Sequence, residues 1–173
     1  MSENSHPLVG IIMGSDSDLD IMKKAAATLD ELGITNEVEI VSAHRTPGKM
    51  ADYASSAQKR GIKTIIAGAG GSAHLPGMTA AYTELPVIAV PIVRDNNNDA
   101  AIKSSNAMPP GVPLAVMSAN GSVNAALFAA AIIAVENADV RERLVSYRQN
   151  MHDKVIDTAD KLKDIGWEKY FDQ

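Results

Sequence analysis

The stretch LVGIIMGSDSD, from Leu8 to Asp18, decides the fold class of this chain. Six almost wholly apolar residues run directly into a cluster of glycine, serine and aspartate. A short apolar run of this kind predicts a buried strand that ends in a loop. After the cluster, apolar residues recur at helical spacing as far as Leu32, and Gly33 supplies the stop signal expected just past a helix end. The chain therefore opens with a strand, a loop and a helix.

Four more short stretches have the composition of strands. Two of them end in small and polar residues, as the first does, and two are rich in Val, Ile and Leu and too short for typical helices. They are Val38 to Val41, Thr64 to Ala67, Pro86 to Val93 and Pro113 to Ser118. Between the first two of these four, Pro47 to Arg60 carries its apolar residues on one face and ends before Gly61, which predicts a second helix.

The alternation of strands and helices determines the architecture that we expect. Strands that are apolar along their length need cover on both faces, and right-handed crossover helices provide it for parallel strands. We therefore expect an α/β protein, a flavodoxin-like three-layer α/β/α sandwich with a five-stranded parallel sheet. Its length fits one domain over residues 1–173. Residues 1–6 are polar and are expected to form a disordered lead-in.

Two further helices are expected in the last third of the chain. Asn124 to Val135, NAALFAAAIIAV, is apolar on every side, so one sheet face cannot account for its burial. Its alanines would let another backbone approach closely, and we predict a homo-oligomer, although a deep position within the domain would also explain this composition. Residues 139–165 place apolar side chains at helical steps with charges between them. This pattern predicts a long C-terminal helix that packs on the body or on a neighbour.

The composition excludes several classes of protein and partner. With no cysteine, disulfides, thiolate nucleophiles and cysteine-ligated metal centres are excluded. A net charge of -5 without basic blocks argues against nucleic acid as a partner. The sequence has no run of about 18 apolar residues and no signal-peptide pattern. We therefore expect a cytoplasmic protein with no membrane partner.

The first polar cluster, Gly14 to Asp18, is suited to hold an anion. In open parallel sheets, ligands collect beyond the carboxyl ends of the strands. A loop that leads straight into a helix offers hydroxyls and backbone N–H groups at the positive end of the helix dipole. The cluster therefore predicts a phosphate site, although Ser15, Ser17 or Asp18 acting simply as a helix cap would explain the same residues.

The second cluster, SAHRTP from Ser42 to Pro47, places an imidazole and a guanidinium at the next strand end. Arg45 can bind a phosphate through two parallel hydrogen bonds. His44 can both give and take a proton near neutral pH. The alternatives are a structural role for His44 and a surface ion pair for Arg45. The polar cluster after the first strand makes both alternatives less favoured.

The third cluster, AGAGGSAHLPG from Ala67 to Gly77, is dense in glycine and alanine. Such a backbone can approach a flat ligand and offer N–H donors to an anion, whereas the alternative is a flexible loop. His74 could contact the ligand or cap the helix that follows, and we favour the first. Together the three clusters predict a small, planar, phosphorylated ligand.

These segments resemble a known family. MGSDSD, SAHRTP and AGAGGSAHLPGM are similar to the signature segments of PurE-type carboxyaminoimidazole ribonucleotide mutases, and the resemblance extends from about residue 8 to 137. Arg45 and the run Gly68 to Gly71 resemble the mutase branch more than the branch that carboxylates directly.

The resemblance implies a function and a set of site residues. It implies an isomerase of purine biosynthesis that interconverts N5-carboxyaminoimidazole ribonucleotide and 4-carboxy-5-aminoimidazole ribonucleotide, in an octamer, without metal or organic cofactor. By resemblance, His44 is the acid-base residue, and the phosphate and ribose contacts come from strand-end residues. The implied phosphate residues are Ser15, Ser42 and Arg45, the ribose residue is Asp18, and Gly70, Gly71, His74 and Leu75 lie beside the imidazole.

One segment departs from the family pattern. Between Arg94 and Ala107 only Ser104 aligns, followed by Met108 and Pro109. Three consecutive asparagines favour turns over helix, so we expect a cover over the site that is more mobile or that recognises a different ligand. A paralogue that carboxylates or decarboxylates another phosphorylated azole is therefore an alternative. A non-catalytic nucleotide-binding or flavin-binding module is a second one, but it leaves His44 unexplained.

Overall fold

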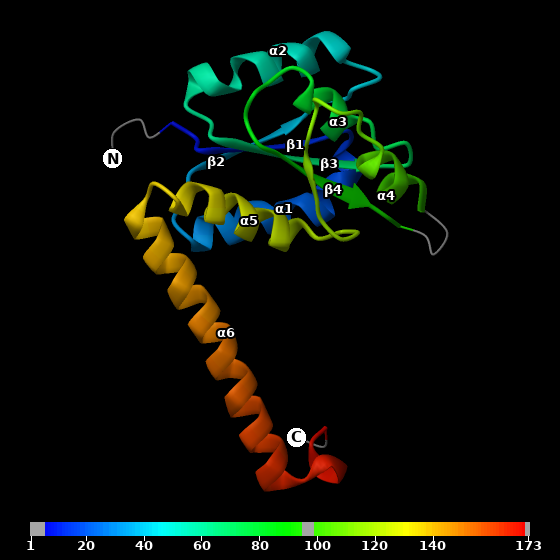
Figure 1. The fold of residues 1–173 in the computed structure, drawn as a ribbon. Helices are drawn as coiled ribbons and strands as arrows, with labels where there is room; N and C mark the ends of the chain where they lie inside the picture. Colours follow the sequence, from blue (N-terminus) through cyan, green and yellow to red (C-terminus); the bar gives the residue numbers. More distant parts are fainter. Residues whose placement is uncertain (1–5, 95–98, 172–173) are drawn as a thin grey trace.

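The computed structural model describes residues 6–94 and 99–171. Its centre is one parallel sheet with the strand order β2-β1-β3-β4-β5 (Figure 1). The strands are β1 (Val9–Met13), β2 (Asn36–Ile40), β3 (Thr64–Gly70), β4 (Val87–Ile92) and β5 (Ala115–Val116). The predicted α/β class with five parallel strands is confirmed.

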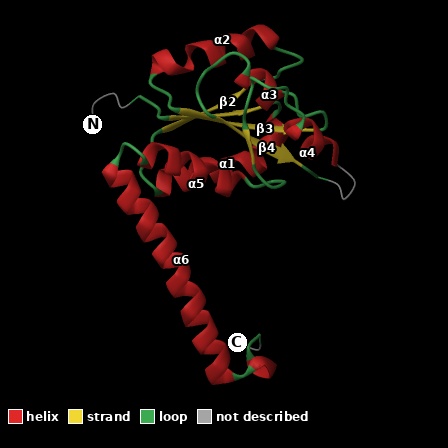
Figure 2. Ribbon diagram, in the orientation of Figure 1, coloured by secondary structure: helices red, strands yellow, loops and turns green. Residues whose placement is uncertain are grey.

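Helices cover both faces of the sheet, as Figure 2 shows. One face packs against α1 (Leu19–Glu31) and α5 (Ser122–Ala134). The other packs against α2 (Pro47–Ala57), α3 (Leu75–Ala80) and α4 (Asp99–Asn106). Three short 3-10 turns complete the described elements, η1 (Asp16–Asp18), η2 (Gln58–Arg60) and η3 (Trp167–Lys169).

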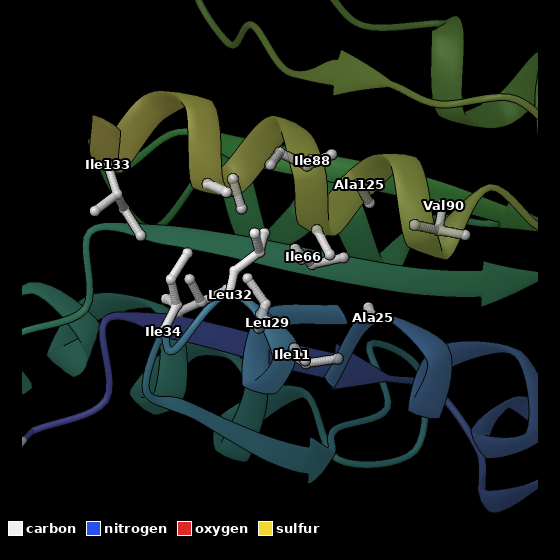
Figure 3. Close-up of a cluster of buried hydrophobic side chains, with 14 of the residues drawn as sticks. Ile11, Ala25, Leu29, Leu32, Ile34, Ile66, Ile88, Val90, Ala125 and Ile133 are labelled. Carbon is white, nitrogen blue, oxygen red and sulfur yellow. The ribbon is translucent and has the colours of Figure 1, made fainter. Parts of the chain in front are cut away.

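The central strands are buried on both sides. In β1, Ile11 belongs to the core under α1 and α5, whereas Ile12 belongs to the core under α2. This alternation follows from the two-residue period of a strand. Figure 3 shows Leu29 of α1 between Ile66 of β3 and Ile11 of β1. The strand ends, and the loops that leave them, are therefore held by packing on two sides.

The apolar helix α5 lies within the domain. Its alanines Ala125, Ala126, Ala129 and Ala130 are fully buried in the core shared with α1. Small side chains allow α5 to pack closely against α1. Burial within the domain, one of the two explanations that the sequence left open, therefore accounts for much of the composition of α5. Phe128 remains 43% exposed on the outer side of the same helix.

Several predicted strand boundaries were wrong. The second strand lies at Asn36–Ile40 and not at 38–41, and it is not apolar along its length, because an edge strand is covered less than a central one. Val38 and Ile40 are 41% and 47% exposed. The last strand has two residues where six were predicted. Residues 1–5 of the predicted lead-in lie outside the described residues, and the carbonyl oxygen of His6 accepts a hydrogen bond from Thr35.

The segment after β4 contains a helix that the sequence did not predict. Asn96 to Asn98 lie outside the described residues, so their predicted turn preference is not described. The residues after them form α4, in which Ala101 is fully buried. Burial of this helix against the sheet outweighs weak local propensity.

The predicted C-terminal helix is α6 (Ala138–Ile165), one residue longer than expected. Only Val140 and Leu144 of this helix are buried, and Figure 1 shows the rest extending away from the body. Partly buried Tyr147 also packs against the core, so packing on the body is limited to the first three turns of α6. Within residues 6–94 and 99–171, no helix has both the length and the apolar character needed to cross a bilayer.

Candidate functional site

A cavity of about 450 Å³ lies at the carboxyl ends of β1 to β4. It adjoins the point between β1 and β3 where the strand order reverses, which is the usual ligand position in such sheets. All the predicted site residues except Gly71 line it. The lining residues are Gly14, Ser15, Ser17, Asp18, Ser42, Ala43, His44, Arg45, Ala69, Gly70, Ser72, His74, Leu75 and Arg94.

The loop after β1 is ordered by its own hydroxyl and carboxylate groups. Ser15 caps η1, because its Oγ accepts a hydrogen bond from the backbone N–H of Ser17 at 3.3 Å. The capping alternative therefore holds for Ser15, and the same side chain still lines the cavity. Asp18 makes no side-chain cap bond to α1. Asp18 is thus a buried carboxylate at the cavity wall.

The turn after β2 presents His44 and Arg45. Thr46 closes this turn, since its backbone N–H donates to the Ser42 carbonyl oxygen at 2.9 Å and its Oγ1 accepts from the Ser42 N–H at 3.0 Å. Ala43 is 6% exposed and anchors the turn in the core under α2. The two side chains that follow Ala43 are exposed, so His44 is not a structural histidine of the interior.

Arg45 joins the first two loops. Its Nη2 donates to the Gly14 carbonyl oxygen at 2.7 Å, and its Nε donates to Ser42 Oγ at 3.3 Å. Its Nη1 makes no hydrogen bond to the part of the chain that the structure describes. These contacts fix the guanidinium beside Ser15 and Ser42, which makes this end of the cavity suited to an anion.

The two histidines of the site face each other. Nε2 of His44 lies 2.9 Å from Nδ1 of His74, with the rings nearly perpendicular at 85°. His74 precedes α3 and makes no side-chain cap bond to it, so the capping alternative was wrong. One nitrogen of the pair must donate and the other accept, hence the two rings can share one proton.

The glycine-rich loop forms the wall beside the histidines. A Cβ on Gly70 would lie 3.2 Å from the Ile92 carbonyl oxygen, and Gly71 has a φ of +60°, a conformation that favours glycine. The N–H of Ala73 donates to Ser104 Oγ at 3.0 Å, which ties this loop to α4. Leu75 is 2% exposed and belongs to the same buried cluster as Ala69 and Ala73 of this loop.

Arg94 is a site residue that the sequence pattern did not predict. It follows β4 and lines the cavity, and its Nη2 lies 2.9 Å from Asp20 and 3.8 Å from Asp18. The only available signal was a cation directly after an apolar strand. Burial raises the pKa of Asp18 above its ordinary value, and the Arg94 charge acts in the opposite direction.

The described ranges contain no group of three or more His, Cys, Asp or Glu side chains arranged to hold a metal ion. The groups that line the cavity are the guanidinium groups of Arg45 and Arg94, the hydroxyls of Ser15 and Ser42, and the imidazoles of His44 and His74. Such a site can hold an anionic group and transfer a proton within the same cavity.

The fold and this cavity define a class of protein: a doubly wound α/β protein with a cavity lined by histidine and arginine side chains at the switch point of its sheet. A family model described as AIR carboxylase matches residues 8–154. The chain therefore belongs to the AIR carboxylase family.

Relatives and a solved structure agree with this assignment. The chain is 48% identical to the N5-carboxyaminoimidazole ribonucleotide mutase of Thermotoga maritima, over 96% of this chain and 98% of that protein. It is 46% identical to the mutase of Pyrococcus horikoshii, over 99% and 97%. It is 49% identical to the phosphoribosylaminoimidazole carboxylase of Schizosaccharomyces pombe but spans 30% of that protein. The crystal structure of Treponema denticola PurE matches with a TM-score of 0.84 and 33% identity, covering 91% of this chain and 99% of that one.

Proposed function

We propose that this chain is a mutase that converts N5-carboxyaminoimidazole ribonucleotide into 4-carboxy-5-aminoimidazole ribonucleotide in purine biosynthesis. The observation that carries the proposal is the contact between His44 and His74, 2.9 Å apart in a cavity that Arg45 also lines. Relatives that carry the mutase name at 46% and 48% identity over nearly their whole length support it.

The part of the cavity lined by Arg45, Ser15 and Ser42 receives the 5′-phosphate. Ser15 and Ser42 offer hydroxyls, and Arg45 offers a guanidinium already held by the Gly14 carbonyl oxygen. Charge-assisted hydrogen bonds of this kind are about twice as strong as neutral ones. The Asp18 carboxylate accepts hydrogen bonds from the ribose hydroxyls.

The imidazole of the substrate lies against Gly70, Gly71, His74 and Leu75. Protonated His44 donates its proton to the exocyclic nitrogen while the bond from that nitrogen to the carboxylate breaks. This step releases carbon dioxide and leaves a neutral amine and a neutral His44. The electron-rich ring carbon then attacks carbon dioxide to form the carbon–carbon bond. His44 finally removes the proton from that carbon, which restores the aromatic ring and the protonated histidine.

Position and proton transfer supply the catalysis in this scheme. Carbon dioxide held against the ring replaces a bimolecular encounter, the advantage that oriented sites provide. General acid-base catalysis by a histidine contributes about 10²- to 10⁴-fold. The scheme uses neither a metal ion nor an organic cofactor.

The proposal extends to the assembly and its surroundings. We propose a homo-octamer, to which the exposed apolar side chains of α6 contribute contacts. The chain acts as a single domain in the cytoplasm on a small-molecule nucleotide, without nucleic acid or membrane as partners. The exposed side chains that support self-association are Val145, Met151, Val155, Ile156 and Leu162.

An assay of the conversion tests the proposed function. Purified protein is mixed with N5-carboxyaminoimidazole ribonucleotide, and the appearance of the carbon-carboxylated isomer is followed with and without added bicarbonate. The mutase produces the isomer at a rate independent of bicarbonate. A rate that requires bicarbonate would identify direct carboxylation, and no product would favour a paralogue with a different azole substrate.

A further inference from the structure

Arg94 connects the end of β4 to the beginning of α1. Its Nη2 lies 2.9 Å from Oδ1 of Asp20, and its Nη1 lies 3.4 Å from Oδ2 of the same carboxylate. Nη2 also contacts the carbonyl oxygen of Ser17. The same nitrogen is 3.8 Å from Oδ1 of Asp18. Asp20 thus holds the guanidinium in a two-point contact, with its charge next to a second carboxylate.

The two carboxylates differ in their surroundings. Asp20 is exposed, whereas Asp18 is 7% exposed and lines the cavity. Burial raises the pKa of Asp18, and the negative charge of Asp20 acts in the same direction. Arg94 and the Ser17 hydroxyl oppose them. The other titratable or cationic groups lining this cavity are His44, Arg45 and His74.

We infer that Arg94 is a positioning residue that keeps the Asp18 carboxylate ionised and in place at the cavity wall. An ionised carboxylate accepts hydrogen bonds through both oxygens, whereas a protonated one gives up part of this capacity. The identity of the accepted group, ribose hydroxyls, rests on the proposed function. The electrostatic effect of Arg94 on the Asp18 carboxylate is independent of the proposed function.

The substitution Arg94→Gln removes the cation and keeps hydrogen-bonding capacity. An opposite charge within about 4–6 Å lowers the pKa of a carboxyl group, so we expect the pKa of Asp18 to be higher in Arg94→Gln than in the unmodified protein. On the acid side of the pH profile, KM then rises above that of the unmodified protein. The kcat changes little, because the lost interaction is uniform binding. Arg94→Lys retains the charge and restores most of the original profile.

Asp20→Asn separates this action from a merely structural one. Loss of the Asp20 charge lowers the pKa of Asp18, so the acid limb of the KM profile moves to lower pH, opposite to Arg94→Gln. If the Arg94–Asp20 pair only tied β4 to α1, the two variants would raise KM alike at every pH. That outcome would overturn the inference. Lys23→Gln, at an exposed site on α1, removes the same charge and should leave the profile unchanged.

A titration without substrate makes the test independent of the proposed function. Carbon-13 NMR of aspartate-labelled protein, with Asp18→Asn to assign the signal, follows the Asp18 carboxyl with pH. We expect a higher pKa of Asp18 in Arg94→Gln than in the unmodified protein. Equal values would overturn the inference whatever the substrate is. Absence of turnover in the unmodified protein would instead overturn the proposed function and leave the titration result in force.

Discussion

At the scale of single residues, the site depends on side chains that come from separate loops. His44 follows β2 and His74 follows β3, thirty residues later, and their nitrogens meet at 2.9 Å. Neither ring is buried, so a ligand in the cavity can reach both. His44 is therefore the donor of the proton that the proposed reaction needs. The adjacent imidazole of His74 fixes the orientation of the His44 ring.

The variant His44→Asn tests that assignment. Its amide can occupy a similar position but cannot carry the proton, so kcat should fall by about 10²- to 10⁴-fold. Circular dichroism and binding of the 5-aminoimidazole ribonucleotide should remain close to those of the unmodified protein. His6→Asn, an exposed histidine outside the cavity, is the matched control and should keep full turnover. Near-normal kcat in His44→Asn would remove His44 from the mechanism.

The raised pKa of Asp18 predicts a pH dependence of stability. Because the folded chain binds this proton more tightly than the unfolded chain does, the stabilisation is present below the ordinary carboxyl pKa and is lost as pH rises through the raised value. Asp18→Asn removes this dependence. The difference in unfolding free energy between the two proteins, measured in urea, should move in favour of the variant as pH rises, by at most about 1.4 kcal/mol per pH unit. A difference that moves the other way would contradict the burial effect.

At the scale of elements, packing of α2 on β1 and β2 sets the position of the turn that carries His44. Tyr53 of α2 lies over Gly10 of β1, and the Arg60 guanidinium lies 4.6 Å from the centre of the Tyr53 ring. Arg60 in turn forms an ion pair with Glu37 of β2. A Cβ on Gly10 would overlap the Tyr53 hydroxyl. This close approach is why a glycine stands in the middle of a buried strand.

Gly10→Ala should therefore reduce stability. Overpacking of a filled core costs about 1–3 kcal/mol, measurable as the unfolding free energy in urea. Adding Tyr53→Phe should recover part of the loss, since it removes the overlapping oxygen. Gly48→Ala, where a Cβ meets nothing within 4 Å, should instead stabilise α2 by about 0.5–1 kcal/mol. Equal effects of Gly10→Ala and Gly48→Ala would show that the overlap is relieved without cost.

The strands and the polar residues at their ends could be predicted from the sequence because both depend on local pattern. The clusters after β1, β2 and β3 all line the cavity that was predicted to form there. The contact between His44 and His74 could not be predicted from local pattern, because the distance between the two rings depends on how two loops pack. Arg94 was missed because a lone arginine after a strand has no motif. Helix α4 was missed because burial of Ala101 determines it more than propensity does.

At the scale of the whole molecule, α6 stands apart from the body. Beyond its first three turns it exposes apolar side chains, among them Val155 at 67% and Leu162 at 41%. Apolar groups repeated along a projecting helix favour association with another surface. This agrees with the proposal of a homo-oligomer.

The double variant Val155→Glu, Leu162→Glu should weaken the assembly. Charges at exposed positions change the stability of the body little, typically within about 0.5 kcal/mol, but they oppose burial in a subunit contact. Sedimentation velocity should show the octamer for the unmodified protein and smaller species for the variant. Asn150→Glu, at an exposed polar position of α6, is the control and should keep the octamer. An undiminished octamer in the double variant would exclude these side chains from the contact.

We propose that one site moves the carboxyl group from nitrogen to carbon while His44 carries the proton. The most direct test uses N5-carboxyaminoimidazole ribonucleotide labelled with carbon-13 in the carbamate, in a large excess of unlabelled bicarbonate. The label in the isolated 4-carboxy product is then measured by mass spectrometry. We expect that nearly every product molecule formed on the enzyme keeps the label, and that His44→Asn forms the product about 10²- to 10⁴-fold more slowly. Product that carries the unlabelled carbon of the medium would contradict the proposal.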